Sequence, residues 1–125
     1  MKKHFNFLLA GVVIAAFAFT FIPARKSVVG HWRAAYGDGT KGKVVFRTDG
    51  TYEATFDGQT WKVGGQYKMD ADISTVTDST CGFGYWAKYK AAWYTDDSLR
   101  MTVIEDSCAG RRADADNSVM VRVKK

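Results

Sequence analysis

The sequence predicts an all-β fold, an antiparallel up-and-down barrel of about eight strands, and three observations support this prediction. Apolar and polar residues alternate with period two along most of residues 27–125, which is typical of strands with one solvated face. Short turn sequences separate these segments, among them Asp-Gly pairs at positions 38–39, 49–50 and 57–58. No segment in this range shows sustained apolar spacing of three and four, so long helices are not expected.

Eight segments are predicted as strands. The alternation is clearest where Trp61, Tyr67 and Met69 share one face and Lys62 and Lys68 lie on the other. Asp-Gly pairs favour tight antiparallel connections, because both central positions tolerate positive φ. The predicted strands run from Val28 to Tyr36, Lys43 to Arg47, Thr51 to Phe56, Trp61 to Met69, Ile73 to Thr77, Gly84 to Tyr94, Leu99 to Glu105 and Ser118 to Lys124.

Short links join nearly all neighbouring strands, so each strand is expected to pair with the next along the chain. Such a meander either stays open with two bare edges or closes, and closure removes the edges that invite aggregation. We therefore predict a closed barrel, whose interior is filled by side chains or holds one small ligand. The segment from Ala109 to Asp116 has room for a short helical turn and no more.

Residues 1–26 have the pattern of a signal peptide. Lys2 and Lys3 precede an uncharged apolar run of 18 residues, from Phe5 to Ile22. We predict cleavage after Ala24, and the alternative is an uncleaved N-terminal membrane anchor helix. Either outcome places residues 27–125 outside the cytoplasm as one domain that is periplasmic, secreted or envelope-anchored.

The positive charge of the chain is concentrated in this N-terminal segment. The formal net charge is +5, but residues 27–125 contain 14 basic and 13 acidic side chains. No element carries a cluster of Lys and Arg, which is the footprint of a phosphate-binding surface. A nucleic-acid partner is therefore not expected.

The two cysteines of the chain, Cys81 and Cys108, are predicted to form a disulfide, because an exported domain meets an oxidising compartment. In the predicted strand order they lie in two loops at the same end of the barrel, beside adjacent strands. The closed loop of about 27 residues stabilises the fold by about 3 kcal/mol in the chain-entropy model. A reactive or metal-binding pair is the competing interpretation, but no ligand cluster surrounds either residue.

The first predicted strand opens with Val28-Val29-Gly30-His31-Trp32, which resembles the Gly-x-Trp opening of lipocalins. The stretches from Phe46 to Tyr52 and from Asp106 to Arg111 are also similar to small secreted bacterial lipocalin-like domains. The resemblance covers the whole domain in strand order. It implies that Trp32 packs at the closed end of the barrel beside Gly30 and that Arg122 of the last strand covers it.

Residues 27–125 contain no recognisable catalytic or metal-binding pattern. His31 is the one histidine in this range and is expected on the surface. No Ser-His-Asp, Cys-His or metal-spaced set is present, and the acidic pairs at positions 70, 72, 96 and 97 are interpreted as turn formers. We therefore expect neither catalysis nor a metal or cofactor.

Aromatic residues and one charged loop remain as candidates for binding. Core filling is the simpler interpretation of the aromatic residues, and the ligand-lining candidates are Trp61, Tyr67, Tyr85 and Tyr89. Trp86 shares a face with Lys88 and Lys90, so it is expected to be exposed. In the charged loop around Arg111, the acidic and basic groups either pair locally in solvent or leave Arg111 to hold an anionic group at the rim.

These observations predict a monomeric, non-catalytic binding protein for a small hydrophobic or amphipathic ligand. The alternative is a protein-interaction or inhibitor module that presents Trp86 and the Arg111 loop at the open rim. A barrel-shaped isomerase is a third class, which no residue supports.

Overall fold

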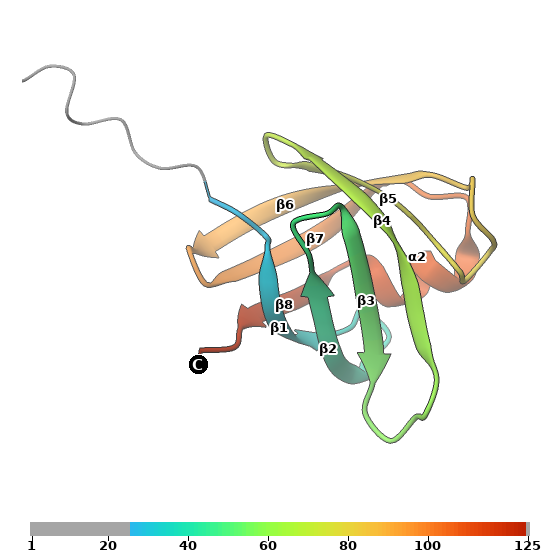
Figure 1. The fold of residues 1–125 in the computed structure, drawn as a ribbon, viewed down its shortest axis with the longest axis horizontal. Helices are drawn as coiled ribbons and strands as arrows, with labels where there is room; N and C mark the ends of the chain where they lie inside the picture. The colour runs from blue at the N-terminus through green and yellow to red at the C-terminus, as the bar shows by residue number, and fades with distance from the viewer. Residues whose placement is uncertain (1–25, 125) are drawn as a thin grey trace, which may run out of the picture.

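The computed structural model describes residues 26–124, which form eight antiparallel strands and one short helix (Figure 1). The predicted signal or anchor helix lies outside these residues. Within residues 26–124, no helix has the length and apolar character needed to cross a membrane. The elements are β1 (Gly30–Ala35), β2 (Lys41–Phe46), β3 (Thr51–Phe56), β4 (Lys62–Asp70), β5 (Ile73–Asp78), β6 (Ala87–Thr95), β7 (Ser98–Glu105), α2 (Ala109–Ala115) and β8 (Ser118–Arg122).

The strands close into a barrel in sequence order, as predicted. Every strand pairs antiparallel with its neighbour along the chain, and β1 pairs with β8 from Trp32 opposite Arg122 to Ala35 opposite Val119. Closure leaves none of the eight strands with an unpaired edge, which removes the surfaces on which further strands add. The predicted short turn between the last two strands is the seven-residue helix α2.

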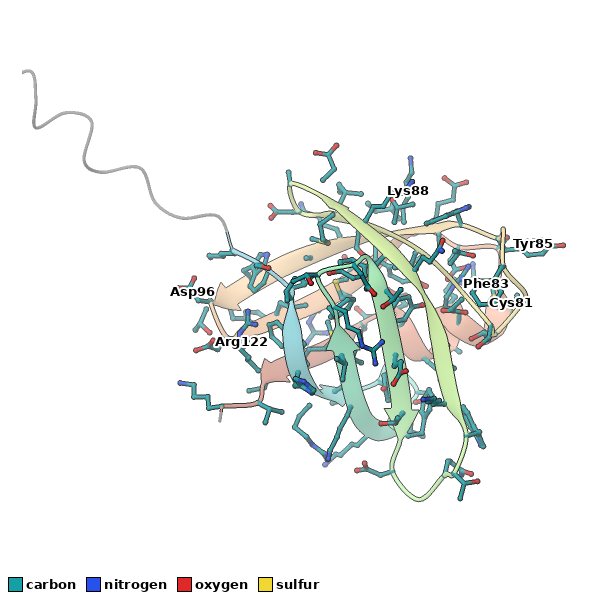
Figure 2. The ribbon with its side chains drawn as sticks, in the orientation of Figure 1. Cys81, Phe83, Tyr85, Lys88, Asp96 and Arg122 are labelled. Carbon is teal, nitrogen blue, oxygen red and sulfur yellow. A yellow bond between two sulfur atoms is a disulfide. The ribbon has the colours of Figure 1, made fainter. Side chains whose placement is uncertain are left out.

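The up-and-down order gives the barrel two chemically different ends. The β2–β3, β4–β5 and β6–β7 turns lie at the Trp32 end, where β1 begins. The β1–β2, β3–β4, β5–β6 and β7–β8 connections lie at the opposite end, called here the helix end because α2 lies there. Figure 2 shows Arg122 and Asp96 at the Trp32 end, and Cys81, Phe83 and Tyr85 at the helix end.

The Trp32 end is sealed by the residues that the lipocalin resemblance singled out. Trp32 is fully buried and its indole N–H donates to the carbonyl oxygen of Val28 at 2.8 Å. The Arg122 guanidinium lies 4.3 Å from the centre of the Trp32 ring, a cation–π geometry. It also donates to the carbonyl oxygens of Ser27 at 2.7 Å and Val29 at 2.8 Å. These hydrogen bonds hold residues 27–29 against the Trp32 end of the barrel.

The sixth strand begins later than predicted. It was expected from Gly84, with Tyr85 among the ligand-lining residues, but β6 begins at Ala87 and Tyr85 is exposed. The chain before β6 departs from strand geometry because Gly82 and Gly84 take positive φ. Trp86 is 40% exposed, as expected. From Ala87 onward the alternation continues as predicted.

The predicted disulfide is present between Cys81 and Cys108, whose Cα atoms are 5.9 Å apart. It joins the β5–β6 connection to the residue that precedes α2. The helix is therefore attached covalently to a neighbouring loop at its N-terminus. This attachment fixes the position of α2 over the helix end of the barrel.

Candidate ligand-binding site

A cavity of about 100 Å³ lies inside the helix end of the barrel. Inward-facing side chains of the strands form its mostly apolar wall, and α2 with the β5–β6 connection supplies most of its polar groups. The wall residues are Tyr36, Val44, Phe46, Tyr52, Ala54, Phe56, Val63, Val76, Tyr89, Met101, Ala115 and Met120, and the polar residues are Asp78, Thr80, Arg111, Asp114 and Ser118. The cavity therefore combines an apolar body with a polar end.

Arg111 reaches this polar end from α2. Arg111 and Ala115 are four residues apart and so lie on one face of the helix, and this face is turned toward the barrel. Arg112, on another face, is exposed. The side chain of Arg111 is only 4% exposed, so the covalently fixed helix inserts a buried guanidinium into the barrel.

The Arg111 guanidinium forms a two-pronged ion pair with Asp106, which follows β7. Its Nε lies 2.9 Å from Oδ2 and its Nη2 lies 2.9 Å from Oδ1, while Nη2 also donates to the carbonyl oxygen of Tyr85 at 2.8 Å. Burial opposes ionisation of Asp106, but hydrogen bonds from Arg111, the Tyr89 hydroxyl and the Cys108 amide outweigh it and hold the pKa of this carboxyl below its ordinary value. The pair is a fixed charged element of the site.

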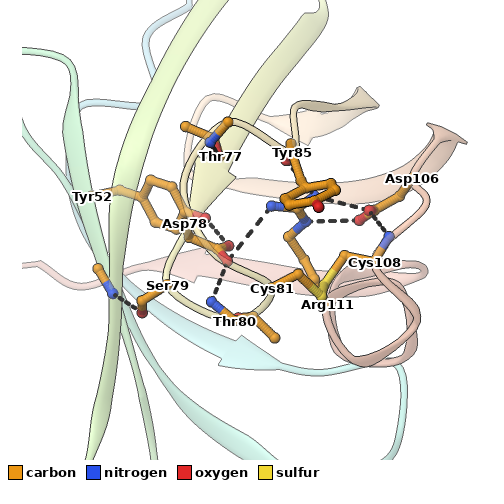
Figure 3. A network of polar contacts seen from close by, with 12 residues as sticks. Tyr52, Thr77, Asp78, Ser79, Thr80, Cys81, Tyr85, Asp106, Cys108 and Arg111 are labelled. Carbon is orange, nitrogen blue, oxygen red and sulfur yellow. Dashed lines mark hydrogen bonds and ion pairs between the residues drawn. A yellow bond between two sulfur atoms is a disulfide. The ribbon is translucent and has the colours of Figure 1, made fainter.

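A second buried carboxylate, Asp78, lies at the end of β5 on the other side of Arg111 (Figure 3). It is 2% exposed, and it accepts hydrogen bonds from the Tyr52 hydroxyl and from the Thr80 amide, the latter at 2.9 Å. Burial and the adjacent Asp78 charge raise the pKa of Tyr52. Tyr52 therefore remains a hydroxyl donor at physiological pH.

One nitrogen of the cluster is not satisfied. Arg111 Nη1 is buried and has no hydrogen-bond partner among residues 26–124. It lies 3.6 Å from Asp78 Oδ1, which is beyond ordinary hydrogen-bond length. A buried donor without a hydrogen bond costs about 1–3 kcal/mol, so this nitrogen is the unsatisfied donor of the cluster.

The connection between β1 and β2 closes against α2 on the far side of the cavity. The Gly37 amide donates to the carbonyl oxygen of Asp114 at 2.8 Å, and a Cβ at Gly37 would lie only 1.9 Å from the carbonyl oxygen of Asp116. Burial, followed by interaction with the nearby Asp38 carboxyl, raises the pKa of Asp114 to about 6. The contact between turn and helix therefore contains a titratable group.

The predicted lining residues divide into two groups. Tyr89 and Arg111 line the cavity, whereas Trp61, Tyr67 and Tyr85 do not. Arg111 does pair locally, with Asp106, as one interpretation expected, but the pair is buried and not solvated. The expected position of Arg111 at the rim is wrong, because α2 carries it inside the barrel.

The three other candidates lie around the cavity rather than in its wall. Tyr67 is buried below it and donates to the carbonyl oxygen of Arg47 at 2.6 Å. Trp61 is 53% exposed and precedes β4, where its ring lies 4.8 Å from that of Phe56. Tyr85 is 58% exposed in the β5–β6 connection. Trp61 and Tyr85 were both predicted to lie within strands, but each precedes the first residue of its strand.

Asp78 is the site residue that the sequence analysis missed. Asp78 follows Ser74 and Val76 at alternate, inward-facing positions of β5. An acidic residue in this inward-facing series was the one indication that the sequence offered. The partner residue Tyr52 is buried on β3 and donates its hydroxyl hydrogen to Asp78. Within residues 26–124, no group of three or more His, Cys, Asp or Glu side chains is placed to hold a metal ion.

Strand number and strand order decide the class of this barrel. Eight antiparallel strands close in simple sequence order, which is the up-and-down arrangement of lipocalins. The fold is lipocalin-like. This lipocalin-like barrel has a mostly apolar cavity at its helix end and the buried Trp32 at its other end.

Comparisons with known proteins add one structural similarity. The chain is similar to the crystal structure of a lipocalin-like protein from Bacteroides uniformis ATCC 8492, with 16% sequence identity and a TM-score of 0.49. The match covers 77% of this chain and 98% of that one. No protein-family model and no curated protein matches the sequence.

Proposed function

We propose that this protein is an extracytoplasmic, non-catalytic binding protein that takes a small hydrophobic or amphipathic ligand into its barrel. The observation that carries the proposal is the cavity of about 100 Å³, with mostly apolar walls and a few polar groups. Apolar cavities with a few convergent polar groups are the usual form of small-molecule sites. The disulfide between Cys81 and Cys108 supports an oxidising, exported location.

The cavity size restricts the ligand. Drug-sized ligands occupy pockets of about 300–1,000 Å³, whereas an apolar cavity of about 150 Å³ holds benzene. A cavity of about 100 Å³ therefore suits a compound of single-ring size or the end of a short hydrocarbon chain. The walls offer Phe46, Phe56 and Met101 for contact with such a group.

The proposal is tested by binding and by filling the cavity. We expect native mass spectrometry of the gently purified protein to show a retained small molecule, and NMR titration with toluene to shift signals of the cavity wall. Ala54→Leu adds three carbons inside the cavity and is expected to weaken toluene binding at least tenfold. Ala92→Leu, on the outward face of β6, is the matched control and is expected to bind normally.

Two results would contradict the proposal. One is the absence of both a retained molecule and toluene binding. The other is equal binding by the Ala54→Leu and Ala92→Leu variants, which would place the ligand outside the barrel. Melting curves of both variants establish that each remains folded during the comparison.

A further inference from the structure

The polar end of the cavity is incomplete in a way that specifies a ligand group. The Nε and Nη2 atoms of Arg111 are bonded to Asp106 and to the Tyr85 carbonyl. Among residues 26–124, Nη1 alone of the three guanidinium nitrogens makes no hydrogen bond, and its ion pair with Asp78 Oδ1 spans 3.6 Å. Arg111 and Asp78 both line the cavity. A donor and an acceptor therefore lie side by side at its polar end without reaching one another.

We propose that the ligand carries a neutral hydroxyl group that accepts a hydrogen bond from Arg111 Nη1 and donates one to Asp78 Oδ1. This inference rests on the proposed function and names the chemical class of its ligand, a small apolar alcohol or phenol. An oxygen atom about 2.8 Å from each partner would bridge the two atoms, which lie 3.6 Å apart. The hydroxyl would satisfy the one buried nitrogen of Arg111 that the protein leaves without a partner.

Charge argues against a carboxylate in this position. The formal charges of Asp78, Asp106 and Arg111 sum to −1, and Asp106 already neutralises the guanidinium through two hydrogen bonds. A ligand carboxylate would bring a third negative group into a buried site with one cation, which desolvation makes costly. A hydroxyl adds no charge.

Charge and hydrogen bonding also disfavour the other simple classes of ligand. A protonated amine would bring its charge against Arg111 Nη1. A pure hydrocarbon would fill the walls but leave Nη1 without an acceptor. An ether or ketone would accept from Nη1 but add no second donor to Asp78 Oδ1, which accepts from the Thr80 amide at 2.9 Å. A hydroxyl satisfies both atoms with a single oxygen.

Three probes of similar shape separate these cases, namely phenol, toluene and benzoate. In a wholly apolar cavity phenol binds less well than toluene, because its hydroxyl loses hydrogen bonds to water. With the bridging site, we expect phenol to bind at least tenfold more tightly than toluene and at least tenfold more tightly than benzoate. Isothermal titration calorimetry at pH 7.5 measures this order, using the oxidised protein as purified after export of the full-length chain.

The outcomes separate the inference from the function on which it rests. Equal or tighter binding of toluene would overturn the hydroxyl site and leave the hydrophobic binding function intact. Tighter binding of benzoate than of phenol would overturn it in favour of an anion site. If none of the three bound, both the inference and the proposed function would fall.

The Arg111→Lys variant tests the position of the hydroxyl. Lysine retains the charge but lacks the planar fork that holds Asp106 and presents Nη1. We expect the ratio of phenol to toluene affinity to fall about tenfold. Toluene binding in the variant shows that the cavity persists, so an unchanged ratio in a toluene-binding variant would contradict the bridge.

Discussion

Arg111 of α2 and Asp106 at the end of β7 form an ion pair with two parallel hydrogen bonds of 2.9 Å, and both side chains are buried inside the barrel. The two residues are only five positions apart, yet the chain between them turns through Cys108 and starts a helix. The pair therefore fastens the helix to the barrel as well as shaping the cavity.

We expect Asp106→Ala to lower the free energy of unfolding by about 3–5 kcal/mol, because it leaves a buried guanidinium without its main partner. Chemical denaturation followed by tryptophan fluorescence measures the loss. Asp57→Ala removes the solvent-exposed ion pair with Arg33 and is expected to cost less than about 1 kcal/mol. Equal losses in the two variants would contradict a special role for the buried pair.

Reduction of the disulfide is expected to destabilise the domain by about 3 kcal/mol, because the Cys81–Cys108 bond constrains a loop with a sequence separation of 27. Thermal melting with and without a reductant measures the effect, and the double variant with Ala at both positions should match the reduced protein. An unchanged melting temperature under confirmed reduction would show that the bond contributes nothing.

The contact between Asp114 and Asp38 predicts a pH-dependent stability. Because burial and Asp38 raise the pKa of Asp114 from 3.8 to about 6, the protonated form is the one that folding favours. Its contribution is complete below about pH 3.8 and is lost as the pH rises through about 6. Asp114→Asn, which resembles the protonated form, should be more stable than the natural protein at pH 8 by about 1 kcal/mol, because a half-buried carboxyl is partly screened by solvent.

The same difference should nearly vanish at pH 4, where Asp114 is protonated in the natural protein. Urea denaturation at pH 4, 6 and 8 tests this trend. Asp72→Asn, in the exposed β4–β5 turn, serves as the control and should show no such dependence. A constant difference for Asp114→Asn across this range would contradict the assignment of the titrating group.

We expect Gly30→Ala to destabilise the domain by about 1–3 kcal/mol. Gly30 has a φ of +135°, and an added Cβ would lie 3.0 Å from Arg122 Nη1. An L side chain at this position is strained and displaces the guanidinium that covers Trp32. Gly64→Ala is the matched control, since an added Cβ there meets nothing within 4 Å; a comparable loss in both variants would contradict a specific requirement at Gly30.

The alternation of side chains determined the architecture and most strand positions. Alternation with a period of two indicates which residues face inward, and the short turns indicate which strands are neighbours. Eight strands in sequence order could therefore be predicted from local patterns. Trp61 and Tyr85 show where this reasoning stops. Their positions continue the alternation, but the strands begin only at Lys62 and Ala87, because glycines with positive φ precede both strands, Gly58 in one case and Gly82 and Gly84 in the other.

The polar end of the cavity was decided by tertiary structure alone. Asp78 and Arg111 are 33 positions apart in the chain and meet because strand closure and the disulfide bring α2 over the end of β5. No local pattern encodes that distance, since it depends on the register of several strand pairs and on the path of two loops. The sequence by itself determined a barrel with an apolar interior, and only the folded chain placed a buried guanidinium with a free donor inside it.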